Sequence, residues 1–282
     1  MSIPAWTRRN PIAAYVILAC AVSWIAVSPL VAAWFGLLAP IAPAWHGIGA
    51  LGPITAAILV TVATGGWAGL RELLGRMARW RVGAAWWMLA VGSPVALLAL
   101  AALLLRVFGS PWPDTAPLQA WSAEPAWVAN LVAASLAYGI GEEPGWRGFA
   151  LPRLQAGRSA LRATLILTVL WALWHTPYFT YRYHIVGISG YVGFFACFVA
   201  GAVWLTFLYN SSGGSVLMAI LWHIVWNVVN VVGAALSSDL VVVMNVLVIP
   251  LGLVALVVGG PRKLSWPEKH VIEPMRPAQV SL

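Results

Sequence analysis

The chain has 282 residues, of which 61% are hydrophobic and only 9% are charged, and its formal net charge is +8. This apolar share excludes an ordinary soluble domain and predicts an all-α, polytopic membrane protein surrounded by the lipid bilayer. The positive charge does not indicate a nucleic-acid partner, because the basic residues lie between apolar stretches rather than on one face or tail.

Eight apolar stretches have roughly the 20 residues that a transmembrane helix needs. The predicted spans cover residues 11–35, 47–66, 84–105, 125–145, 161–180, 187–209, 213–234 and 240–259. No stretch is long and polar enough to form a second, soluble domain. We therefore expect one membrane domain with a three-span N-terminal region at 1–122, a second region at 123–260 and a cytoplasmic tail at 261–282.

The basic residues divide unequally between the two alternating sets of loops. One set carries only Arg106 and Arg182. The other set, which includes both termini, carries the remaining fourteen: Arg8, Arg9, Arg71, Arg76, Arg79, Arg81, Arg147, Arg153, Arg158, Arg162, Arg262, Lys263, Lys269 and Arg276. Because cytoplasmic loops are enriched in Lys and Arg, we expect both termini in the cytoplasm. The excess of arginine over lysine, with abundant Ala, Gly and Trp, indicates a prokaryote, so the expected location is its cell membrane.

Two adjacent carboxylates, Glu142 and Glu143, lie at the end of the fourth predicted span, four residues before Arg147. On a helix, Glu143 and Arg147 are i,i+4 neighbours that can form an ion pair, whereas Glu142 points about 100° away. Glu142, in lower dielectric and without an adjacent cation, is then the candidate general base. The alternative is a structural ion pair at a helix end, with Glu142 in the headgroup zone.

Three further polar side chains lie inside predicted spans. His175 is in the fifth span, and His223 and Asn227 share one face of the seventh at i,i+4 spacing. Such groups can simply hydrogen-bond neighbouring helices, but ionisable groups on three separate spans favour a shared polar cavity. The other histidines fall in predicted loops or the tail and receive no role: His46, His184 and His270.

The three motifs in order, Glu-Glu-x-x-x-Arg, aromatic-x-x-x-His and His-x-x-x-Asn, resemble the CPBP family of intramembrane proteases. That family includes the type II CAAX prenyl endopeptidases and bacterial proteins linked to bacteriocin self-immunity. The resemblance covers roughly residues 123–235, with Trp171 where the family often has Phe. It implies a catalytic region within 123–260 and an endopeptidase acting on a membrane-associated protein or peptide. The implied catalytic residues are Glu142, Glu143, Arg147, His175, His223 and Asn227.

The same residues suit peptide hydrolysis by direct attack of water, since no nucleophilic Ser or Cys accompanies the motifs. Glu142 with His175 would polarise the water, and His223 with Asn227 would donate hydrogen bonds to the oxyanion. A zinc site formed by His175, His223 and Glu142 stays open, but the chain lacks a His-Glu-x-x-His pair and Asn227 suits a donor better than a ligand. We therefore favour a mechanism that requires no cofactor.

Two other functions use the same buried groups. One is a proton- or cation-coupled transporter, which predicts internal symmetry that the first four spans do not show. The other is a non-proteolytic membrane scaffold.

The predicted depths of the catalytic groups disagree. His175 lies about 21 Å along a helix that starts at Leu161, whereas Glu142 lies near the cytoplasmic end of its span. The two can meet only if helix four continues past Glu142 or helix five begins earlier. We expect a cavity that opens to the cytoplasm, with the polar groups partway into the membrane.

Overall fold

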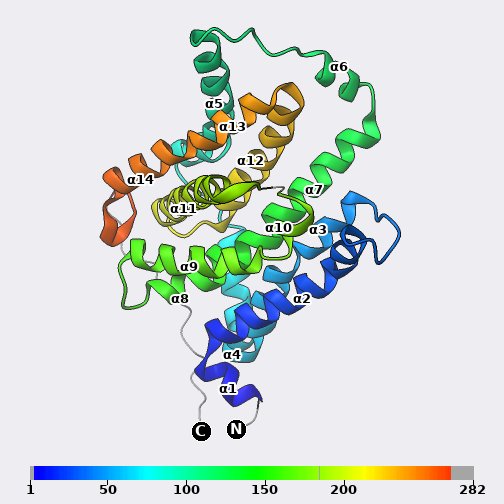
Figure 1. Cartoon of the computed structure of the whole chain (residues 1–282). Helices are drawn as coiled ribbons and strands as arrows, with labels where there is room; N and C mark the ends of the chain where they lie inside the picture. Colours follow the sequence, from blue (N-terminus) through cyan, green and yellow to red (C-terminus); the bar gives the residue numbers. More distant parts are fainter. Residues whose placement is uncertain (1–2, 184, 268–282) are drawn as a thin grey trace.

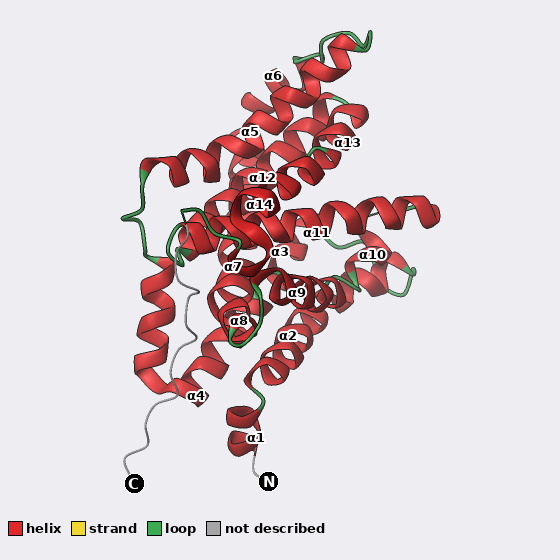
Figure 2. Cartoon of the chain, turned by 90° about the vertical axis from the view of Figure 1, so that its left-hand side faces the viewer, coloured by secondary structure: helices red, strands yellow, loops and turns green. Residues whose placement is uncertain are grey.

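The computed structural model describes residues 3–183 and 185–267, and every regular element among them is a helix (Figure 2). The first half contains α1 (Ile3–Arg9), α2 (Pro11–Trp34), the 3₁₀ turn η1 (Pro43–Trp45), α3 (His46–Gly49), α4 (Gly52–Met77), α5 (Ala84–Val107), α6 (Ala116–Ser122) and α7 (Pro125–Glu143). The second half contains the π-helix η2 (Pro144–Ala150), α8 (Leu151–Gln155), α9 (Ala160–Trp174), α10 (Tyr178–Tyr181), α11 (Gly187–Ser211), α12 (Val216–Leu236), α13 (Ser238–Val246) and α14 (Val248–Lys263).

The predicted polytopic, all-α membrane fold is confirmed. Six helical segments of the described chain are long and apolar enough to cross a bilayer: Pro11–Trp34, His46–Met77, Ala84–Val107, Gly187–Ser211, Val216–Leu236 and Ser238–Lys263. The other two predicted spans, 125–145 and 161–180, correspond to α7 and to the shorter apolar helix α9, which ends at Trp174. The count of eight transmembrane helices therefore stays a prediction.

The fourth predicted span continues well beyond Glu142. Helix α7 passes directly into the buried π-helix η2 and then into α8, so the chain remains helical as far as Gln155. A π-helix has an extra residue per hydrogen-bonded turn and is frequent at functional sites. Of the two ways in which Glu142 and His175 can lie at one depth, the structure therefore shows the first: the fourth predicted span continues past Glu142.

The N-terminal helices pack directly on this irregular segment. The ring of Tyr15, on α2, contacts the rings of Trp146 and Phe149 with centroid distances of 5.3 and 5.0 Å. Gly145 is required here, because a Cβ at this position would lie 2.4 Å from the Tyr15 hydroxyl and 2.7 Å from the carbonyl oxygen of Pro53. The helices of the N-terminal region therefore fix the backbone that carries the carboxylates.

Helix α12 lies in the middle of the bundle, between α5 and α7, and α11 packs along α14. Figure 1 shows α9 running across the molecule, with α8 near one end and α10 at the other, beside α3. This arrangement brings the end of α7, the end of α9 and the middle of α12 together.

Candidate active site

A buried charged group occupies the junction of α7 and η2. One oxygen of Glu143, Oε1, accepts hydrogen bonds from Arg147 Nη1 at 3.0 Å and from His223 Nδ1 at 2.7 Å. The side chains of Glu143 and Arg147 are fully buried. The predicted Glu143–Arg147 ion pair is therefore present, and it also holds a histidine from α12.

Glu142 has different neighbours. Its Oε2 atom accepts a hydrogen bond from the indole nitrogen of Trp171, on α9, at 2.9 Å. The guanidinium of Arg147 lies over the ring of the same tryptophan, 4.5 Å from its centroid. Trp171 therefore contacts both Glu142 and the cation that pairs with Glu143.

His175 follows the last residue of α9, one turn after Trp171. Its Nδ1 atom lies 2.8 Å from the carbonyl oxygen of Trp171. A carbonyl can only accept, so Nδ1 carries the proton and a neutral ring keeps the lone pair of Nε2 for another partner.

Four of the six predicted residues line one cavity of about 390 Å³: Glu142, His175, His223 and Asn227. The remaining two, Glu143 and Arg147, lie behind its wall and support His223 and Trp171. The structure thus brings all six residues into one connected arrangement. It also leaves Asn227 Nδ2 buried without a hydrogen-bond partner among the described atoms, which is unusual for an amide donor.

Sequence reasoning missed several cavity residues. Trp171 was assigned only as a family aromatic, although its i,i+4 spacing to His175 places both on one helix face. His46, which received no role, begins α3, is buried, and is hydrogen-bonded through Nδ1 to the hydroxyl of Tyr181 at 2.6 Å. No local signal shows that a histidine in a predicted loop meets a residue 135 positions away. His184 and His270 lie outside the described residues.

The residues considered as zinc ligands do not form a ligand set. Within residues 3–183 and 185–267, no group of three His, Cys, Asp or Glu side chains is arranged to hold a metal ion. His175 and His223 each use Nδ1 on a protein partner and keep Nε2 open, and Glu142 accepts from Trp171 through one of its two oxygens. A mechanism that requires no metal stays a prediction.

The fold and this arrangement define a polytopic membrane protein with carboxylate and imidazole side chains buried inside its helical bundle. Residues 124–229 match the family model of the type II CAAX prenyl endopeptidase Rce1-like proteins, a segment that contains all six candidate residues. The chain is also 32% identical over 92 residues to CAAX prenyl protease 2 of Methanococcus maripaludis. That match covers 30% of this chain and 34% of the relative. The family resemblance expected from the three motifs is confirmed for this region.

Proposed function

We propose that the protein is an intramembrane endopeptidase that hydrolyses a peptide bond of a membrane-associated protein or peptide. The observation that carries the proposal is a buried carboxylate, Glu142, in the same cavity wall as His175, His223 and Asn227, whose amide nitrogen has no partner among the described atoms. The family match and the name of the archaeal relative support a protease independently.

In the proposed reaction, water bound between Glu142 and His175 attacks the scissile carbonyl carbon. Glu142 takes the proton of this water through the oxygen that does not hold Trp171, and His175 Nε2 orients the water by accepting its second hydrogen. A new C–O bond forms, the carbonyl π electrons move to oxygen, and a tetrahedral oxyanion results.

The oxyanion is stabilised by donors on α12. Asn227 Nδ2 has no other partner among the described atoms, so its N–H groups are available to the reacting oxygen. His223 donates from Nδ1 to Glu143, and in the proposal its Nε2 serves as a second donor to the oxyanion. Collapse of the intermediate breaks the C–N bond, and the proton held by Glu142 passes to the leaving amine.

Three residues act in the proposal as positioning residues rather than by touching the substrate. Glu143 holds His223, and Arg147 neutralises Glu143 while packing on the Trp171 ring. Trp171 fixes one oxygen of Glu142 and, through its backbone carbonyl, the tautomer of His175.

The test is Glu142→Gln, which removes the base and keeps the size of the side chain, compared with Glu124→Gln at an exposed position before α7. Purified protein in detergent is assayed with quenched fluorescent peptides that end in a prenylated CAAX sequence, and with the same peptides lacking the lipid. In parallel, new protein termini are compared in membranes that contain the wild type or Glu142→Gln.

We expect hydrolysis and new termini with the wild type and Glu124→Gln, and neither with Glu142→Gln, at unchanged thermal stability. Equal turnover of wild type and Glu142→Gln would contradict the proposed base. Absence of any wild-type cleavage in both assays would favour a scaffold or transporter.

A further inference from the structure

Two asparagines outside the six candidate residues line the same cavity. Asn230 lies on α12 and Asn245 lies on α13, and both side chains are half-buried. They bond to each other, because Asn245 Nδ2 donates to Asn230 Oδ1 at 2.8 Å. Such an amide pair can simply join two membrane helices. The hydrogen bonds that this pair leaves unmade indicate a further role.

The neighbouring backbone fixes how both amides are turned. Asn230 Nδ2 donates to the carbonyl of Trp226 at 2.9 Å, and Asn245 Nδ2 donates to the carbonyl of Val241 at 2.7 Å. A carbonyl oxygen accepts and does not donate, so the nitrogen rather than the oxygen of each side-chain amide faces the backbone. The exchange of nitrogen and oxygen that is otherwise open for an asparagine is thus excluded at both positions.

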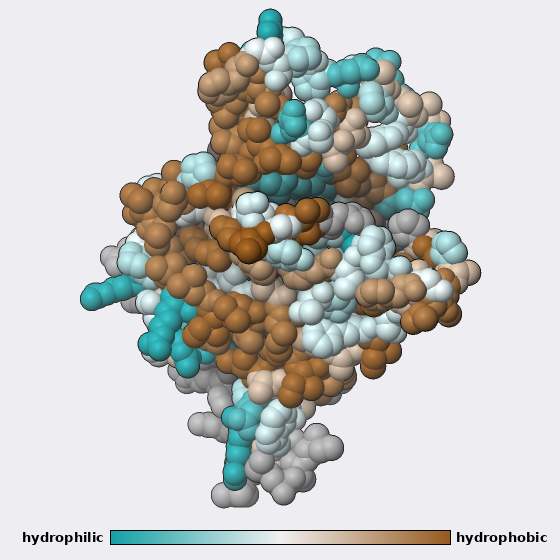
Figure 3. Space-filling view, in the orientation of Figure 1, coloured by the Kyte–Doolittle hydropathy of each residue, from teal (hydrophilic) through white to brown (hydrophobic). Residues whose placement is uncertain are grey.

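The count of donors and acceptors shows what the pair offers to a ligand. Asn245 uses both of its N–H groups, on Asn230 and Val241, and no described residue bonds to its Oδ1 atom. Asn230 uses its oxygen and one N–H group, which leaves its second N–H group. The pair therefore presents one acceptor and one donor on neighbouring side chains of the cavity wall. Figure 3 shows hydrophilic residues in a hollow between α11 and the helices above it, which include α12 and α13 (Figure 1).

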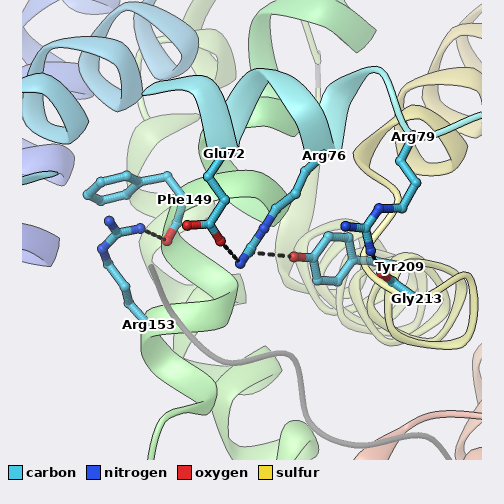
Figure 4. Close-up of polar contacts among 7 residues, drawn as sticks. All are labelled: Glu72, Arg76, Arg79, Phe149, Arg153, Tyr209 and Gly213. Atoms are coloured by element: carbon cyan, nitrogen blue, oxygen red, sulfur yellow. Dashed lines mark hydrogen bonds and ion pairs between the residues drawn. The ribbon is translucent and has the colours of Figure 1, made fainter. Parts of the chain in front are cut away.

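Asn210, at the end of α11, is a matched asparagine that does not line the cavity. Its Nδ2 atom donates to Gln155 at 3.2 Å and to the carbonyl of Lys263 at 2.7 Å, and its Oδ1 atom accepts from Gln155 at 3.2 Å. Figure 4 shows the neighbouring contact, in which Arg76 donates to the hydroxyl of Tyr209. Asn210 therefore uses both N–H groups and its oxygen to connect helix ends. The cavity pair differs from it by keeping a donor and an acceptor unused.

The pair lies beside the proposed oxyanion donor. Asn230 is three residues after Asn227 on α12, so the two side chains are neighbours on the helix surface, about 4.5 Å apart along its axis. Successive residues of an extended chain are about 3.3–3.6 Å apart. A peptide whose scissile carbonyl lies at Asn227 therefore places a residue within two positions of that carbonyl at the pair.

The ligand that fits one donor beside one acceptor is the backbone of an extended chain. In an extended segment the N–H and C=O groups of one residue point to the same side, as in the hydrogen-bonded pairs of an antiparallel sheet. Asn245 Oδ1 can accept from that N–H group, and Asn230 Nδ2 can donate to that C=O group. A helical segment does not offer these groups, because they already bond to each other within the helix.

We infer that Asn230 and Asn245 form a subsite that binds the backbone of an extended substrate next to the bond that is cleaved. The subsite contacts the N–H and C=O groups of one substrate residue rather than its side chain, so it selects an unwound segment and not a particular sequence. This inference rests on the proposed function, because the scissile bond is placed by Glu142 and Asn227.

The experiment combines a change in the substrate backbone with a change at Asn245. In the peptide that is cleaved fastest, each peptide N–H group within two residues of the scissile bond is replaced in turn by an ester oxygen, and the scissile bond itself is left unchanged. Asn245→Leu keeps the size of the side chain and removes its acceptor, Asn245→Ala removes both, and Asn210→Ala is the control. Mass spectrometry identifies the products, and thermal unfolding in detergent checks each variant.

We expect one of the esters to lower kcat/KM of the wild type by about 5–10-fold, mainly through KM, which is the scale of one lost hydrogen bond. Both Asn245 variants should lower kcat/KM of the unmodified peptide to a similar extent, and the same ester should then lower it by at most about another twofold. Asn210→Ala should lower thermal stability and keep the full effect of the ester, because Asn210 does not line the cavity.

Equal effects of every ester on the wild type and on both Asn245 variants would overturn the inference and leave the pair as a link between α12 and α13. The wild type alone gives a second test: the subsite is wrong if no ester lowers kcat/KM by more than about twofold. In either case, cleavage that still requires Glu142 leaves the proposed peptidase standing. Absence of wild-type cleavage of any peptide would instead defeat the proposed function, and the subsite with it.

Discussion

Two Glu–Arg pairs with identical i,i+4 spacing lie in different regions of the molecule. Glu72–Arg76 lies in the last turns of α4, and Glu143–Arg147 spans the junction of α7 and η2. The Glu72 side chain is 43% exposed, whereas both members of the second pair are 0% exposed. The same local spacing therefore yields a partly hydrated pair at one end and a desolvated pair behind the catalytic cavity.

The neighbours of the two pairs differ in kind. At the end of α4, Arg76 also donates to the Tyr209 hydroxyl, which joins α4 to α11. In the bundle interior, Glu143 holds His223, and nearby polar atoms such as Asn227 Nδ2 are left without partners among the described residues. The polar groups around Glu72 and Arg76 therefore connect helices, whereas those around Glu143 and Arg147 include donors that remain available for a ligand.

The largest expected effect is on the buried pair. Glu143→Gln or Arg147→Gln should lower the free energy of unfolding by about 3–5 kcal/mol, because each leaves an uncompensated buried charge. The matched pair, Glu72→Gln and Arg76→Gln, should show a coupling energy of at most about 1 kcal/mol, because the Glu72 carboxylate is 43% exposed and stays hydrated. Both double-mutant cycles are measured by reversible unfolding in detergent. Similar coupling energies in the two regions would remove the distinction drawn from burial.

The next effect tests the donors on α12. Asn227→Ala should lower kcat by about 10²–10³-fold, the scale of losing one oxyanion donor, with little change in thermal stability because its amide nitrogen has no other partner among the described atoms. His223→Ala should lower kcat to a similar extent and also lower stability, since it removes a partner of Glu143. Kinetics and thermal unfolding of the same preparations compare the two. A loss of stability in Asn227→Ala as large as that in His223→Ala would assign Asn227 a structural role.

A smaller effect is expected at Trp171. Trp171→Phe keeps an aromatic ring beside Arg147 and removes the indole donor to Glu142, so it should cost about 1 kcal/mol of stability, the worth of one hydrogen bond. If the bond positions the base, the pH profile of kcat should shift as well. An unchanged pH profile with lowered stability would make Trp171 a packing residue only.

The smallest effect should come from chelation. We expect dialysis against a chelator to leave turnover and stability unchanged, since no group of three His, Cys, Asp or Glu side chains among the described residues is arranged to hold a metal ion. Elemental analysis of active protein accompanies the assay. Stoichiometric zinc that is lost and returns together with activity would defeat the metal-free mechanism, without changing the proposed reaction.

The sequence located each helix that carries the candidate site because membrane helices leave strong local signals. The length of an apolar stretch predicts a span. The span predicted at 187–209 begins at the same residue as α11 and ends two residues before it. The ends of helices four and five were predicted less well. Pro144 and Gly145 predict a distortion of the helix at this point, but not a π-helix packed so closely on Tyr15 that a Cβ at Gly145 would lie 2.4 Å from its hydroxyl.

Composition, the alternation of basic loops and the three motifs were enough to determine a polytopic membrane protein, the order of its spans and six candidate residues. These features are local, because hydropathy, charge and i,i+4 spacing are properties of neighbouring residues. Only the tertiary structure decided which atoms meet: that Glu143 rather than Glu142 holds His223, that the Trp171 side chain donates to Glu142, and that one cavity is lined by residues of α7, α9 and α12. Such contacts depend on how helices distant in sequence rotate and pack against one another, which the sequence of a single helix does not fix.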